Sequence, residues 1–65
     1  MLLLIFLILN SMYIYKFIFS HYTVLRVIAV SLEEAHEIIK LQFGERFFRN
    51  NIDDNNDVEL IITEI

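Results

Sequence analysis

The sequence contains no cysteine and no proline, has one glycine, and carries five Lys and Arg residues against nine Asp and Glu residues. The absence of Cys excludes a disulfide scaffold, a thiolate metal site and a cysteine nucleophile. A formal net charge of −4 argues against direct nucleic-acid binding, because nucleic-acid binders present a basic surface. The 65 residues suffice for one small domain, and chains this short often gain stability from an oligomer or a partner.

The hydrophobic share of 57% excludes intrinsic disorder and is concentrated at the N-terminus. Residues 2–19 contain one charged side chain, Lys16, and nearly reach the length of a membrane-spanning helix. The basic residues follow this segment, so a single-pass protein anchored by it has its C-terminus in the cytoplasm. A cleaved signal peptide fits less well, because a basic start and a small-residue cleavage site are both missing.

Residues 12–19 also fit a β-strand, because aromatic residues alternate there with Met, Ile and Lys. This period of two is typical of strands and is not required of a membrane helix, so we favour the strand. Residues 1–11 then form an apolar N-terminal extension, and Met12 is an alternative start of the chain.

The remaining chain predicts an α+β fold in the order β-β-α-β, with a three-stranded sheet and one helix packed on one face. Residues 22–30 are rich in β-branched side chains and predict a second strand, hairpinned to the first. Ser31 and Glu34 form a capping box in which Glu34 reaches back to Ser31, and Gly44 stands where a helix C-cap is expected. We expect a polar loop over residues 50–57 and a third strand over residues 58–65, giving one domain over residues 12–65.

One helix covers one face of such a sheet, and the strands are apolar on both faces. If Lys16 and Arg26 share the open face, the aromatic residues of the first strand face the helix. The open face then carries Ile14, Ile18, Val24, Arg26, Ile28 and Val30. Because soluble monomers seldom expose such a surface, we expect it to bind a second copy, as a homodimer, or another protein. Edge-to-edge pairing of residues 58–65 is the alternative.

Two patterns in the sequence could indicate a metal site or a catalytic site, and both have simpler explanations. Acidic and amide residues occupy five ligand positions of a calcium-binding loop: Asp53, Asn55, Asp57, Glu59 and Glu64. The glycine that this loop requires is replaced by Val58, and Glu59 reads as strand, so we expect no metal. Neither His21 nor His36 has partners at a catalytic or metal spacing. We therefore expect a protein that is not an enzyme and has no cofactor.

The acidic residues of the helix and loop form a candidate partner-binding surface. They are Glu33, Glu34, Glu37, Asp53, Asp54 and Asp57. A small acidic protein can occupy the basic site of a nucleic-acid-handling protein, because charge steers such encounters. The alternative is that these charges serve solubility.

The junction from Val27 to Ala35, a strand followed directly by a capped helix, resembles a construction found in very short phage and mobile-element proteins. The resemblance covers residues 12–43 and identifies no single family. It implies an adaptor or an inhibitor of a host enzyme, such as a defence nuclease. Our first hypothesis is accordingly a cytoplasmic protein-binding module, and the second is a membrane accessory subunit anchored by residues 2–19.

Overall fold

The first strand, β1, comprises Tyr13–Ile18 and is the central strand of the sheet. The computed structural model describes residues 12–20 and 23–65. Within them, β1 confirms the strand that the alternation predicted. Residues 13–18 are thus a strand and not part of a membrane helix, and the predicted extension over residues 1–11 lies outside the described residues.

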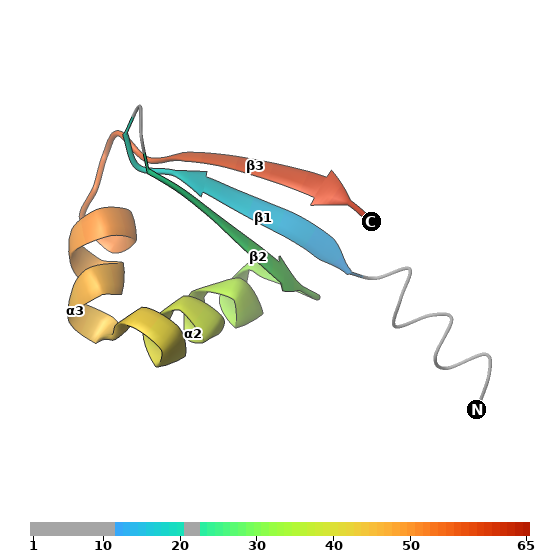
Figure 1. The fold of residues 1–65 in the computed structure, drawn as a ribbon, viewed down its shortest axis with the longest axis horizontal. Coiled ribbons are helices and arrows are strands. Elements are labelled where there is room, and N and C mark those ends of the chain that lie inside the picture. Colours follow the sequence, from blue (N-terminus) through green and yellow to red (C-terminus); the bar gives the residue numbers. More distant parts are fainter. Residues whose placement is uncertain (1–11, 21–22) are drawn as a thin grey trace.

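The sheet has three antiparallel strands in the order β2-β1-β3. Strand β2, Val24–Ala29, pairs with β1 as the predicted hairpin, and β3, Glu59–Glu64, pairs with the other side of β1. Figure 1 shows β2 and β3 at opposite edges, with the C-terminus at the end of β3. The α+β class is thus confirmed, and β1 separates two strands that run parallel to each other.

Helix α2, Leu32–Phe43, begins at the predicted capping residue and ends at the predicted glycine. The Ser31 hydroxyl accepts a hydrogen bond from the Glu34 N–H at 3.1 Å. The Glu34 carboxylate accepts from the N–H of Val30 at 3.4 Å, one residue earlier than the Ser31 N–H that we expected. Gly44 has a φ of 97°, a region that side chains with a Cβ disfavour, so the helix ends there.

The helical segment continues beyond Gly44, which corrects the prediction of one helix followed by a long polar loop. Helix α3, Glu45–Phe48, leads directly into a π-helical turn, η1, Arg49–Asp53. The two segments bury Phe48 and Ile52, whose spacing of four places both side chains on one side. Residues 50–53 are therefore helical because Ile52 joins the core, and the loop is shortened to residues 54–58.

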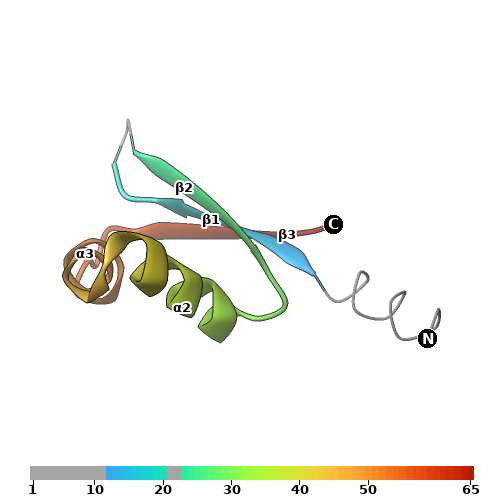
Figure 2. The ribbon, with the colours of Figure 1, turned by 60° about the horizontal axis from the view of Figure 1, so that its bottom comes forward.

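The helices cover one face of the sheet, as Figure 2 shows. Lys16 lies directly opposite Arg26 in the β1–β2 ladder, so the two basic residues share a face as supposed. The other face of the sheet and the helices supply the core, which consists of Tyr15, Phe17, Val27, Ala29, Ala35, Ile39, Phe48 and Ile52. Every residue of β3 remains exposed, so the helical layer covers β1 and β2 better than β3.

Within the part of the chain that the structure describes, no helix is both long and apolar enough to cross a bilayer. Helix α2 has 12 residues and carries four charged side chains along its length: Glu33, Glu34, Glu37 and Lys40. Its amphipathic pattern fits packing against a sheet.

Replacing Ile39 with Ala should lower the free energy of unfolding by about 2–5 kcal/mol, because Ile39 is fully buried between helix and sheet. Leu41 lies on the same helix with 84% of its surface exposed, so Leu41→Ala should change stability by less than about 0.5 kcal/mol. Urea unfolding followed by circular dichroism measures both values, and equal losses would contradict the described packing.

Candidate functional site

The face of the sheet opposite the helices is the first candidate surface. We call it the open face and define it by the outward side chains of the three strands: Ile14, Lys16, Ile18, Val24, Arg26, Ile28, Glu59, Ile61 and Thr63. Val30 follows at the end of β2 and is also exposed. Ile28 is 54% exposed and Ile61 is 45% exposed, on the two outer strands. The register thus places five of the six residues that the sequence assigned to this face on it, and the sixth, Val30, is exposed just beyond β2.

Two positive charges stand next to each other within this apolar surface. Lys16 on β1 and Arg26 on β2 are directly opposite in register, and neither makes a salt bridge within residues 12–20 and 23–65. Like charges in directly opposite positions repel each other, so the pair carries a cost in the isolated chain. A carboxylate from outside would relieve this repulsion.

The predicted acidic residues do not form one cluster. Glu33, Glu37 and Asp53 all lie close enough to His36 to raise its pKa electrostatically, so the helix and the π-helical turn contribute to one group. We call these three residues the helix-side acidic group. Glu37 also pairs with Lys40 at 3.4 Å, an exposed contact.

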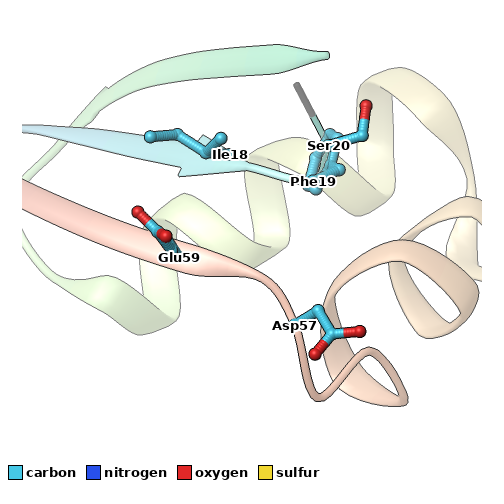
Figure 3. A pocket seen from close by; sticks show the side chains of 5 residues that line it. All are labelled: Ile18, Phe19, Ser20, Asp57 and Glu59. Atoms are coloured by element: carbon cyan, nitrogen blue, oxygen red, sulfur yellow. The ribbon is translucent and has the colours of Figure 1, made fainter. Parts of the chain in front are cut away.

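The other three predicted acidic residues have different surroundings. Glu34 is engaged with the N–H of Val30, and Asp54 ends η1, its N–H donating to the Arg49 carbonyl at 2.8 Å. Asp57 lies at the opposite end of the loop, beside a surface hollow at the end of β1 (Figure 3). This hollow is lined by Ile18, Phe19, Ser20, Asp57 and Glu59.

His36 packs between aromatic rings at the edge of the core, as a half-buried side chain. Its ring centroid lies 4.7 Å from that of Phe48 and 5.9 Å from that of Phe17. Burial, followed by the charge of Lys40, lowers the pKa of His36 below its ordinary value of 6.5, and the helix-side acidic group partly offsets this. The neutral ring is therefore favoured in the folded chain.

The described residues hold no cluster of three or more His, Asp or Glu side chains arranged to bind a metal ion. Of the five residues at calcium-loop positions, Glu59 and Glu64 belong to β3. Asn55 instead organises the turn: its side-chain oxygen accepts from the Asp57 N–H at 2.9 Å, and its amide donates to the Asn51 carbonyl at 3.0 Å. The loop geometry is thus explained by local hydrogen bonds.

Sequence reasoning missed the contribution of β3 to the open face. Ile61 lies directly opposite Lys16, and Glu59 lies opposite Ile18. Alternation in residues 58–65 indicated two apolar faces, but the face that meets the helix depends on register with β1, which is a long-range property.

Comparison of the chain with family models, curated proteins and solved structures gives no match. The surfaces themselves therefore carry the functional argument.

The stability of the protein should fall as the pH is lowered through the range below 6.5. The folded chain holds the His36 proton less tightly than the unfolded chain, so protonation favours unfolding from about 6.5 down to the folded-state pKa. His36→Phe removes this contribution and keeps an aromatic ring between Phe17 and Phe48. Urea midpoints between about pH 7 and pH 5 should decline less in the variant. Identical declines would contradict the assignment.

Proposed function

We propose that the chain is a non-catalytic protein-binding module that uses its open face to bind an unlike protein. The observation that carries this proposal is the juxtaposition of Lys16 and Arg26 within an exposed aliphatic surface. Apolar side chains such as Ile28 supply buried area on binding. The two cations supply specificity, because they favour a partner that places a carboxylate between them.

The same charges disfavour pairing of the open face with itself. A symmetric face-to-face dimer buries both cations of each copy in one interface. Each copy brings one carboxylate, Glu59, for its two cations, and a buried charge without a partner is costly. An acidic partner avoids this cost, since each guanidinium or ammonium then gains a counter-charge. The proposed partner is therefore a different protein whose surface combines an apolar area with at least one carboxylate.

Substituting Ile28→Asp should abolish binding through the open face, because it puts a carboxylate where apolar contact is expected. Leu41→Asp is the matched control: Leu41 is 84% exposed and lies on α2, on the opposite side of the sheet. The wild-type chain and both variants, immobilised at full length, are incubated with extract of the source cells, and bound proteins are quantified by mass spectrometry.

The expected result is a protein retained by the wild type and by Leu41→Asp but reduced at least about tenfold with Ile28→Asp. Arg26→Glu should reduce the same protein, because it reverses the charge that the partner meets. A set of bound proteins that is identical for all variants would refute binding through this face.

The helix-side acidic group supports a second candidate function, inhibition of a nucleic-acid-handling protein at its basic site. The observation in its favour is that Glu33, Glu37 and Asp53, from two helical segments, all act electrostatically on one histidine, beside Lys40. Carboxylates gathered in this way attract a site that normally binds phosphates. This candidate agrees with the implied role of the short phage proteins that the strand-to-helix junction resembles.

Charge reversal of Glu33 and Glu37 together to Lys tests this candidate, with Glu34 left intact because its carboxylate accepts from the Val30 N–H just before the helix. The change should weaken inhibition of a nuclease at least about tenfold while circular dichroism stays unchanged. The same reversal at Glu59 and Glu64, on β3, controls for total charge. Equal loss in both double variants would show a nonspecific charge effect and reject the site.

A further inference from the structure

Strand β3 is exposed on both of its faces and along its outer edge. Leu60 is 38%, Ile61 45% and Ile62 53% exposed, and all six residues of the strand are accessible to solvent. Figure 1 shows β3 at the edge of the sheet farthest from α2 and α3. Three consecutive aliphatic side chains on an open edge are unusual, because exposed edges of this kind promote strand pairing.

The backbone of β3 presents a set of hydrogen-bonding groups to this edge. The Ile65 N–H donates to the Met12 carbonyl at 3.3 Å, which fixes the alternation of hydrogen-bonded pairs between β1 and β3. Residues 59, 61 and 63 therefore direct their backbone groups to β1. The N–H and C=O groups of Leu60, Ile62 and Glu64 point away from β1, and no other strand of the described residues pairs with them.

The opposite edge of the sheet is protected in a way that β3 is not. Arg26 lies in the middle of β2, and a charged side chain there discourages another strand from pairing. Helix α2 also packs against β2. In β3 the two charged residues stand at the ends, Glu59 and Glu64, and the four residues between them are uncharged. The β3 edge is therefore the one suited to pairing.

We propose that β3 pairs antiparallel with β3 of a second copy, centred on Ile61. A two-fold axis perpendicular to the sheet keeps equivalent faces on the same side, so opposite residues must share a face. Centring on Ile61 places Ile61 opposite its own equivalent, Leu60 opposite Ile62, and Glu59 opposite Thr63. Aliphatic side chains then meet aliphatic side chains, and no Glu faces a Glu.

Centring on Ile61 opposes a Glu to an aliphatic residue only outside the strand, where Glu64 lies opposite Val58. The neighbouring registers do so within the strand: centring on Ile62 puts Glu64 opposite Leu60, and centring on Leu60 puts Glu59 opposite Ile61. All three registers join outward backbone groups to outward backbone groups, as hydrogen-bonded pairs require, so the side chains decide among them. The second copy is therefore the occupant that this edge fits, independently of what binds to the open face.

The resulting dimer is closed and leaves the proposed binding face free. The three strands of each copy form one continuous sheet, with both helical layers on the same side. Because each β3 edge is used once, pairing stops at two copies. The two open faces then lie side by side and give a partner two binding sites, which raises the strength of binding.

The test is Ile61→Glu, which acts differently in the monomer and in the dimer. In the monomer the new carboxylate lies opposite Lys16, a favourable cross-strand pair. In the dimer it faces its own equivalent across the two-fold axis. Full-length protein analysed by size-exclusion chromatography with light scattering should show a concentration-dependent mass of twice 7.8 kDa for the wild type. Ile61→Glu should raise the dissociation constant at least about tenfold.

Mixing two oppositely charged variants tests for a gain of dimer, which unfolding of either variant cannot produce. Ile61→Lys alone should also be monomeric, whereas an equimolar mixture with Ile61→Glu should dimerise, because opposite charges then meet at the axis. Ile28→Glu is the matched control on the open face of β2 and should remain dimeric.

Three results would overturn the proposal. They are a wild-type monomer up to about 1 mM, a dimer that survives Ile61→Glu, and a dimer lost equally in Ile28→Glu, which would indicate pairing through the open face. Binding of an unlike protein to the open face is measured separately with Ile28→Asp. Failure of the dimer is therefore distinguishable from failure of the proposed function.

Discussion

The pairing of β1 with a strand on each side is the constraint on which the rest of the structure depends. Because side chains alternate along β1, its position fixes the direction of every side chain in the sheet. Tyr15 and Phe17 face the helices and are buried, while Lys16 between them faces the opposite way. The register then places Arg26 and Ile61 on either side of Lys16. The core and the open face are thus two consequences of one alternating hexapeptide.

The helical layer is too narrow for the sheet that it covers. Helix α2 runs for 12 residues, about 18 Å, which matches the length of one strand. Its diameter of about 10 Å is smaller than the width of three strands spaced about 4.8 Å apart. It packs on β2, and α3 and η1 add Phe48 and Ile52, so the buried side chains gather around β1 and β2. Strand β3 joins the sheet through hydrogen bonds and contributes no buried residue. Its exposure follows from the geometry of the layer.

Local patterns in the sequence predicted most of the elements but not their spatial arrangement. The aromatic alternation identified β1, and Ser31, Glu34 and Gly44 marked the ends of α2. The spacing of four between Phe48 and Ile52 was a usable helical signal, obscured by the surrounding Asn and Asp residues. The pairing of β3 with β1 had no such local signal, because it joins residues more than forty positions apart. The acidic residues could be identified from the sequence, but their division between His36 and the hollow beside Asp57 depends on the fold.

The distribution of charge separates the roles of the two exposed apolar surfaces. The open face contains Lys16 and Arg26 at its centre, so burying it costs less against a surface that supplies negative charge. The β3 edge has its charges at the ends and a run of uncharged residues between them, so an identical strand can cover it without opposing like charges. The chain has a net charge of −4, but its apolar face carries two adjacent cations. Pairing that face with itself would therefore bring four cations into one interface. The proposed edge pairing avoids this difficulty, because it would use backbone hydrogen bonds and Leu60, Ile61 and Ile62 and would leave both cations accessible.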